Sequence, residues 1–275
     1  MALGPAEEFD EGMKHYRMYT KDGNNGARGH FQTVIRNPNS GSLRPRAYAA
    51  LAATYRQDWN FEWNITPTDG LDNKEQQAVY WAKRSFDLDA SLPDGHVQLA
   101  YLYLYQKKWD EAEGEAKLAK QYGDANYADG YAVLAQVLTY RGRPQRAVPL
   151  MEKALELDPQ AQVSYLRQLG QAYYVMGQIE MYQNEKEQEA MNNYQKAEEH
   201  LTRALNHRQA RLTLAAVYME SGQERKAKAL FTLDPDMGRH INIGQRRQQA
   251  PYENPTLRVL YIKALKRAES SAGTP

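Results

Sequence analysis

The chain has 275 residues, of which 42% are hydrophobic and 25% are charged, a composition typical of a soluble protein that can bury a sizeable core. Lys and Arg number 35 against 34 Asp and Glu, so the net charge of +1 provides no overall attraction to nucleic acid or to an anionic membrane. Because there is no cysteine, disulfide bonds, a thiol nucleophile and a cysteine-ligated metal are excluded.

The expected compartment rests on what the sequence lacks. No stretch approaches the roughly 20 apolar residues that a membrane span requires, and the first residues contain no apolar core of a signal peptide. Both observations favour the cytoplasm, while a mature periplasmic protein or an excised domain remains an alternative. We expect no membrane span.

The first predicted elements are a helix near Phe9 to Tyr19 and a second helix marked by Ala27 and Phe31. The alanine-rich stretch AYAALAATY, which ends at Tyr55, predicts the first helix of the next pair. Its partner helix carries apolar residues at helical spacing, namely Ala78, Ala82 and Phe86. Between these two helices, residues 57–74 are predicted to be an insertion.

A repeat becomes clear in the middle of the chain. Leu99, Leu134 and Leu169 recur at intervals of 35 residues, close to the period of about 34 residues of a tetratricopeptide helix pair. The best copy is DGYAVLAQVLTYRGRPQRAVPLMEKALELDP, in which Gly142 is predicted to form the turn between the two helices. Pro144 then suits the first turn of the second helix, where a missing N–H costs little.

The next copy is longer than the repeat. About 15 extra residues, within 178–193, separate its two apolar stripes and contain neither Pro nor Gly. We therefore expect about two additional turns on each helix, which would form a protruding helical hairpin. After one more pair, Asn254 and Pro255 predict the start of a final helix that caps the stack.

The predicted fold is therefore all-α, a tetratricopeptide-like α-solenoid of about five helix pairs with a C-terminal capping helix, forming a single domain over residues 1–275. The candidate pairs and the cap span about 8–38, 45–90, 93–123, 128–159, 162–206, 208–235 and 254–269.

Signatures of catalysis are missing. The sequence contains no GxxxxGK[ST], GxSxG or HExxH motif, so we expect no enzyme activity. His200 and His207 could share a helix face, but no third metal ligand lies near them in sequence, and no metal or cofactor is expected. The basic runs RGRPQR and GQRRQQ lack interleaved aromatic residues, so a nucleic-acid partner is not expected either.

The chain has twenty tyrosines against five phenylalanines. Because Tyr combines an apolar ring with a polar hydroxyl, this excess indicates apolar surfaces that remain in contact with water. In a stack of helix pairs the first helices line a concave face, and the positions next to their packing stripe are rich in Tyr, Arg and Gln. Such side chains combine flat anchors with hydrogen-bonding groups suited to an extended peptide or a carboxylate. The alternative for any single Tyr is packing between neighbouring repeats. The predicted partner-binding residues are Tyr16, Tyr19, Arg56, Tyr101, Tyr105, Gln136, Tyr140, Arg167, Gln171 and Tyr174.

A second patch is predicted as an alternative within the insertion. Trp59, Phe61 and Trp63 alternate with polar residues, as in a short extended segment with one aromatic side. We favour a loop pinned to the edge of the solenoid, and the alternative is a second contact surface for a partner.

Several motifs together carry a family resemblance: RAYAALAATY, the Trp-rich insertion, LGQAYYVMG, LAAVYMESGQERKAKAL and PYENPTLRVLYIKALKRA. With these, the stretch from about Ala47 to Ala268 resembles the C-terminal tetratricopeptide region of bacterial adenylate/guanylate cyclase-like proteins. The chain has no cyclase domain, and the extra residues after Gly177 depart from the usual pattern. The resemblance implies a scaffold or a regulatory module.

We therefore expect a non-catalytic scaffold that binds a protein or peptide partner in its concave groove. The alternative is a regulatory module of a larger, cyclase-like signalling enzyme. A homo-oligomer or a subunit of a larger complex would fit either role.

Overall fold

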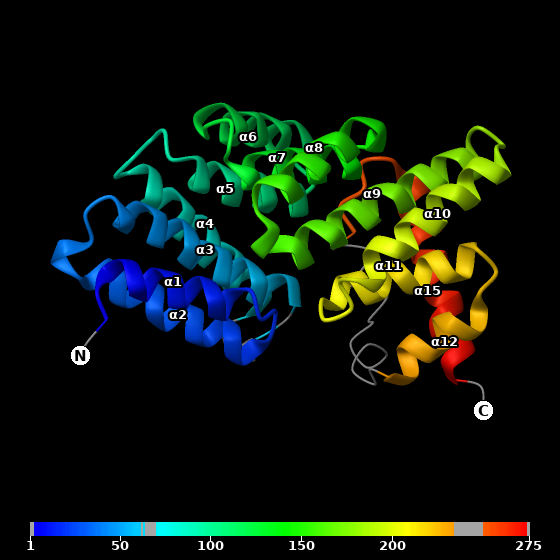
Figure 1. Cartoon of the computed structure of the whole chain (residues 1–275), viewed down its shortest axis with the longest axis horizontal. Coiled ribbons are helices and arrows are strands. Elements are labelled where there is room, and N and C mark those ends of the chain that lie inside the picture. Colours follow the sequence, from blue (N-terminus) through cyan, green and yellow to red (C-terminus); the bar gives the residue numbers. More distant parts are fainter. Residues whose placement is uncertain (1–2, 62, 64–69, 234–249, 274–275) are drawn as a thin grey trace. The chain divides into compact units, whose positions relative to one another are not determined.

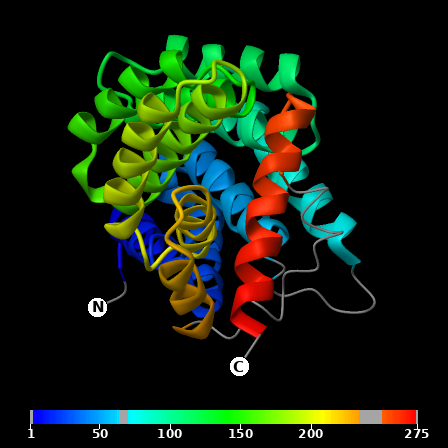
Figure 2. The ribbon, with the colours of Figure 1, turned by 90° about the vertical axis from the view of Figure 1, so that its right-hand side faces the viewer.

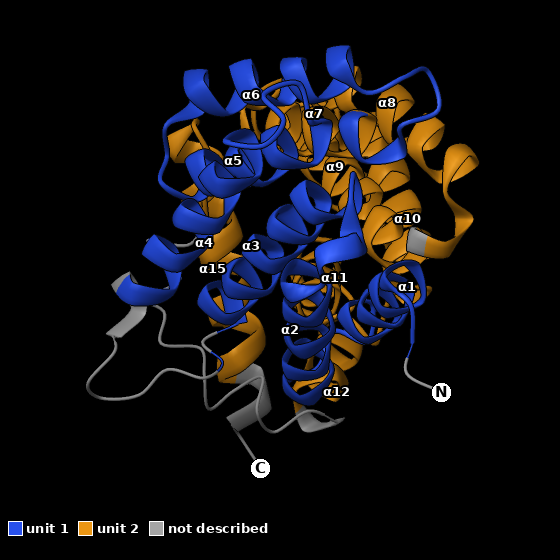
Figure 3. Cartoon of the chain, turned by 90° about the vertical axis from the view of Figure 1, so that its left-hand side faces the viewer, with its two compact units in different colours: residues 1–130 blue, residues 131–275 orange. Residues whose placement is uncertain are grey.

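The computed structural model describes residues 3–61, 63, 70–233 and 250–273, and within these ranges it contains helices and no strand. This confirms the predicted all-α fold. None of the described helices is both long and apolar enough to span a bilayer. The chain divides into two compact units, residues 1–130 and 131–275, which are coloured separately in Figure 3.

Unit 1 consists of three helix pairs, drawn from blue to green in Figure 1. In each pair the two helices pack on one another, and α2 also packs on α3 and α4 on α5. The helices are α1 (Pro5–Tyr16), α2 (Lys21–Arg36), α3 (Leu43–Phe61), α4 (Gly70–Phe86), α5 (Pro93–Tyr105) and α6 (Trp109–Tyr122).

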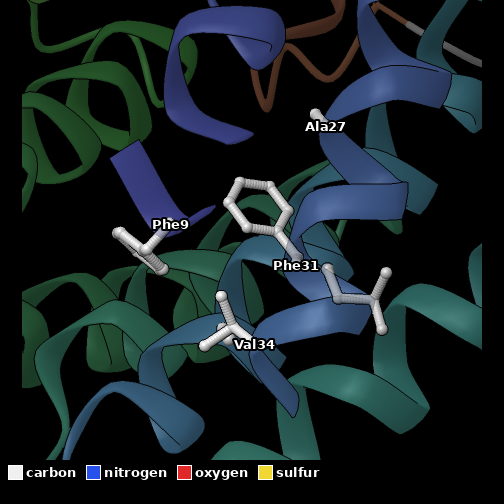
Figure 4. Packing of buried hydrophobic residues seen from close by; sticks show 6 residues of the cluster. Phe9, Ala27, Phe31 and Val34 are labelled. Atoms are coloured by element: carbon white, nitrogen blue, oxygen red, sulfur yellow. The ribbon is translucent and has the colours of Figure 1, made fainter. Parts of the chain in front are cut away.

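The core of the first pair follows the apolar spacing of the sequence. Phe31 and Ala27 of α2 are fully buried, and the ring of Phe9 on α1 lies 5.5 Å from that of Phe31 between centroids (Figure 4). Ala47 and Leu51 of α3 complete the cluster. Because α1, α2 and α3 all contribute residues, the cluster joins the first helix pair to the first helix of the second pair.

Helix α3 is longer than the sequence predicted. It continues through Phe61, so the first residues of the predicted insertion are helical. The reason is the buried carboxylate of Asp58, which accepts hydrogen bonds from Asn24 Nδ2 and Arg28 Nη2, both at 2.6 Å. Residues 62 and 64–69 of the insertion lie outside the described part of the chain.

Unit 2 contains three further pairs and a terminal helix. The helices are α7 (Ala128–Tyr140, which begins in the last residues of unit 1), α8 (Pro144–Leu157), α9 (Gln162–Tyr182), α10 (Glu187–Thr202), α11 (Arg208–Glu220), α12 (Glu224–Leu233) and α15 (Pro255–Gly273). Gly142 and Gly222, in the turns after α7 and α11, have φ values of 71° and 73°, a left-handed conformation that favours glycine. α15 packs on α11 and α12, as Figures 1 and 2 show with α15 in red and α12 in orange.

The residues predicted to form a helical hairpin are distributed over α9 and α10. α9 runs on to Tyr182 and α10 begins at Glu187, and the two helices pack along their length. Residues 234–249, which include the basic run GQRRQQ, lie outside the described part of the chain.

Candidate functional site

The ten residues predicted to bind a partner fall into two groups of five, one in each unit. Those of unit 1 lie on α1, on α3, on α5 and in the turn after α1, and they are Tyr16, Tyr19, Arg56, Tyr101 and Tyr105. All five are half-buried. Those of unit 2 lie on α7 and α9 and are buried. The two groups therefore differ in their access to a ligand.

Arg56 is the centre of the group in unit 1. Its Nη2 donates a hydrogen bond to the hydroxyl of Tyr16 at 3.0 Å, and its Nε donates to Oε1 of Gln98 at 3.1 Å. Its Cζ lies 4.4 Å from the centroid of the Tyr101 ring, in cation–π geometry. We call this set, together with Tyr19 and Tyr105, the Arg56 cluster.

Burial and four tyrosines set the pKa of Arg56. Burial acts to lower the pKa of its guanidinium, but the hydroxyl groups of Tyr16, Tyr101, Tyr105 and Tyr19 together raise that pKa above its ordinary value. No carboxylate of the described residues forms an ion pair with Arg56. Among the residues that the structure describes, the positive charge of Arg56 is thus surrounded by tyrosines and an amide and is paired with no carboxylate.

Helical spacing explains how α5 contributes to the cluster. Gln98, Tyr101 and Tyr105 follow one another at intervals of three and four residues and so share one face of the helix. Leu99 and Leu102, on the adjoining side of the helix, are buried in the core that α5 forms with α3 and α4. Gln98 was not among the predicted residues, although its spacing from Tyr101 and Tyr105 could have identified it.

The aromatic residues of the predicted second patch are arranged differently from the prediction. Trp59 and Phe61 lie in the last turns of α3, so they do not form an alternating extended segment. The Trp59 ring meets the Tyr105 ring edge-on at 5.7 Å, which adds Trp59 to the border of the Arg56 cluster. Phe61 is buried, and its ring stacks on that of Trp63 at 4.6 Å between centroids.

In unit 2 the chain itself covers the predicted face. Tyr174 is only 1% exposed and Arg167 only 5%, and the other three residues are buried to a similar degree: Gln136, Tyr140 and Gln171. The rings of Tyr252 and Tyr261 account for part of this burial, since they lie 4.9 Å from Tyr140 and 5.8 Å from Tyr174. The five residues are therefore not the open groove that the sequence predicted.

Polar groups on the covered face bond to one another. Arg167 Nη2 donates to Gln136 Oε1 at 3.2 Å. Thr213 Oγ1 donates to Gln171 Oε1 at 2.7 Å, and Gln171 Nε2 in turn donates to the Tyr252 hydroxyl. Among the residues that the structure describes, no three His, Asp or Glu side chains are grouped as a metal site would require.

The comparisons with known proteins identify part of unit 2. A family model described as tetratricopeptide repeat matches residues 131–163, which comprise most of α7, all of α8 and the start of α9. The chain contains a tetratricopeptide repeat. The matched stretch includes Leu134, one of the three leucines that define the period, together with Gly142 and Pro144 of the predicted turn and helix start. No curated protein matches the sequence.

Two solved structures of IFIT1 superpose on nearly the whole chain. A human IFIT1 dimer with m7Gppp-AAAA superposes with a TM-score of 0.65 and 20% identity, covering 96% of this chain and 59% of IFIT1. A monomeric IFIT1 mutant superposes with a TM-score of 0.64 and 19% identity, and it covers the same fractions of the two chains. A thermophilic TPR protein of Thermus thermophilus has a TM-score of 0.46 and 22% identity, covering 70% of this chain and 91% of that protein. The likeness to IFIT1 shows the fold, and the chain spans about three-fifths of IFIT1's length.

Proposed function

We propose that the chain is a non-catalytic interaction protein that binds an extended peptide of a partner protein at the Arg56 cluster. The observation that carries the proposal is the half-buried Arg56, whose charge is surrounded by tyrosines and an amide and is not paired with a carboxylate of the described residues. Tetratricopeptide-like folds present such inner faces as binding surfaces, which supports the same role.

The chemistry of the cluster favours a peptide with an acidic group. Arginine has five N–H donors in a planar fork, and the bonds to Tyr16 and Gln98 use only part of them. The remaining donors match a carboxylate or a backbone carbonyl, and the rings of Tyr101 and Tyr105 provide flat apolar walls beside them. Arg, Tyr and Trp are also the residue types that most often dominate binding energy at interfaces.

The turn before α2 supports this interpretation. Tyr19 has a φ of 53°, in the left-handed region that a bulky side chain seldom adopts. Such conformations persist where the surrounding structure holds them and are frequent at functional sites. The Tyr19 hydroxyl is also one of the groups that raise the pKa of Arg56.

Site-specific photocrosslinking in the native organism tests the proposal. A photoreactive phenylalanine analogue is placed at Tyr105, inside the cluster, or at Tyr80, a surface tyrosine of α4 that is 52% exposed. We expect a crosslinked partner peptide from position 105 and none from position 80. Crosslinks to the same partner from position 80 alone would place the interface elsewhere on unit 1.

The alternative role, a regulatory module of a larger cyclase-like signalling enzyme, remains a prediction from sequence resemblance. It is compatible with the same peptide-binding face, because the partner would then be a segment of the enzyme. Identification of the crosslinked peptide as part of a nucleotide cyclase would support this alternative role.

A further inference from the structure

A short non-helical segment before α15, residues 250–253, contacts unit 2 in the manner of a bound peptide. We call the residues that it contacts the inner face of unit 2: Tyr140, Arg141, Gln171 and Tyr261. Its central residue, Tyr252, is 1% exposed, and its ring lies edge-on to those of Tyr140 and Tyr261 at 4.9 and 5.7 Å. Tyr140 ends α7, the first helix of the tetratricopeptide repeat. The segment thus inserts an aromatic side chain where the sequence had predicted a partner's peptide.

Backbone and charge contacts hold the next residue. The N–H of Glu253 donates to the C=O of Tyr140 at 2.9 Å, one of the carbonyls that a helix end leaves without an internal partner. The Glu253 carboxylate accepts bonds from Arg141 Nε at 2.9 Å and from Arg141 Nη2 at 3.2 Å. This bidentate pair is charge-assisted, and the Glu253 side chain is 35% exposed, so it lies at the rim of the face.

The face is also prepared for the hydroxyl group of a tyrosine. Thr213 fixes the Gln171 amide by donating to its Oε1 at 2.7 Å, and the Nε2 of that amide points to the Tyr252 hydroxyl and donates to it. A phenylalanine at position 252 would leave this buried donor without an acceptor, which is costly. The side chains of unit 2 therefore distinguish Tyr from Phe.

We propose that the inner face of unit 2 is a second peptide site, specific for a tyrosine followed by an acidic residue, and that residues 250–253 occupy it as an internal ligand. The partner that fits is an extended peptide containing Tyr-Glu or Tyr-Asp. It would place its aromatic ring between Tyr140 and Tyr261, its hydroxyl at Gln171 and its carboxylate at Arg141. This site is separate from the Arg56 cluster and does not depend on it.

Tethering explains why the site is closed in the isolated chain. α15, which directly follows the segment, packs on α11 and α12 of the same unit. A short tether gives an internal ligand an effective concentration on the order of millimolar. A free peptide with the same contacts and micromolar concentration cannot displace it, so access requires release of residues 250–253 or a partner with additional contacts.

Fluorescence anisotropy with a labelled hexapeptide tests the proposal. The probe has the sequence of residues 250–255, APYENP, and the protein is the full chain, either wild type or the double variant Tyr252→Ala/Glu253→Ala. We expect the double variant to bind the probe at least tenfold more tightly than the wild type does. A probe with Phe in place of Tyr, or Gln in place of Glu, should lose at least threefold of that affinity.

Two results would overturn the proposal. One is a double variant that is folded by circular dichroism but does not bind the probe, and the other is equal binding of the original and altered probes. If the double variant does not fold, Glu253→Gln decides, because it keeps Tyr252 in place and removes only the charge at the rim. This variant should bind the probe at least threefold more tightly than wild type, and equal affinity would refute the internal ligand. Glu156→Gln, on the exposed side of α8, is the matched control and should leave binding unchanged.

Discussion

The ring of Tyr194 on α10 lies directly against the α-carbon of Gly177 on α9, so closely that a β-carbon at position 177 would overlap two of its carbon atoms. Tyr194 is 1% exposed and cannot easily move away, since its hydroxyl also accepts a hydrogen bond from Gln178. We expect Gly177→Ala to lower the free energy of unfolding by about 1 to 2 kcal/mol, because overpacking outweighs the gain in helix propensity. Thermal denaturation measures the change.

Gly114 in the middle of α6 provides the opposite case. It is exposed, and a β-carbon there would meet no atom within 4 Å. Gly114→Ala should therefore raise the free energy of unfolding by about 0.5 to 1 kcal/mol through helix propensity alone. A Gly177→Ala variant that gains stability as Gly114→Ala does would disprove the close packing of α9 on α10.

The carboxylate of Asp58 should be essential to the stability of unit 1. It is fully buried, and its removal in Asp58→Ala leaves the mostly buried Arg28 without its anionic partner and Asn24 Nδ2 with only the carbonyl of Thr54 as acceptor. We expect a loss of about 3 kcal/mol in the free energy of unfolding, since removing Asp58 from its ion pair leaves the charge of Arg28 uncompensated. Asp87→Ala, which removes an exposed pair with Arg84, should change stability by less than about 0.5 kcal/mol in urea titrations. Equal effects of the two substitutions would contradict this account.

His207 should make stability depend on pH. It caps the start of α11 through its Nδ1, which accepts from the backbone N–H of Gln209 at 3.2 Å. Burial, and secondarily the charges of Arg167 and Arg211, hold the pKa of His207 well below its ordinary value. The folded protein thus keeps this imidazole neutral, while the unfolded chain takes up a proton below about pH 6.5. The stabilisation is complete above that pH and declines as the pH falls, by up to about 1.4 kcal/mol per unit.

The variant His207→Asn isolates this contribution. Asn is a good helix N-cap but does not titrate, so the cap is retained and the proton linkage is lost. Urea unfolding between pH 8 and pH 5.5 should therefore show a shallower decline for the variant than for the wild type. Parallel curves would mean that the imidazole becomes protonated in the folded state.

Tyr174 should act as a core residue, in contrast to the expectation from sequence. It is 1% exposed and contacts Tyr194 and Tyr261 in unit 2. Tyr174→Ala should cost about 3 to 5 kcal/mol, the usual range for an aromatic residue in a core. Tyr182→Ala, at a residue of the same helix that is 48% exposed, should cost about 1 kcal/mol or less. Similar, small losses in both, measured by chemical denaturation, would indicate that Tyr174 faces an open groove.

The helix pairs could be read from the sequence because their signals are local. The spacing of Leu99, Leu134 and Leu169 and the glycine at position 142 report packing and turn geometry within one repeat. The same spacing could not show that Gly177, one period after Gly142, lies inside a helix and is needed for close packing instead of a turn. A glycine in a turn and a glycine at a close helix–helix contact look the same in the sequence. They differ only in the residues that pack against them.

The closed face of unit 2 could not be predicted in this way. It depends on contacts such as that of Arg141 with Glu253, which are 112 residues apart in the chain. Nothing in the periodicity of α7 or α9 indicates that Tyr252 packs against these two helices. For the same reason the sequence placed Arg56 and Arg167 in one row, although only Arg56 is accessible on its face.

The most direct test of the proposed function is the affinity of the crosslinked partner peptide for the Arg56→Ala variant, measured by calorimetry. The matched control is Arg84→Ala, which removes an exposed arginine of the same unit that is paired with Asp87. We predict that Arg56→Ala weakens binding at least tenfold, which corresponds to about 1.4 kcal/mol, and that Arg84→Ala changes it less than twofold. A folded Arg56→Ala variant that binds the peptide as tightly as the wild type would contradict the assignment of the Arg56 cluster as the binding site.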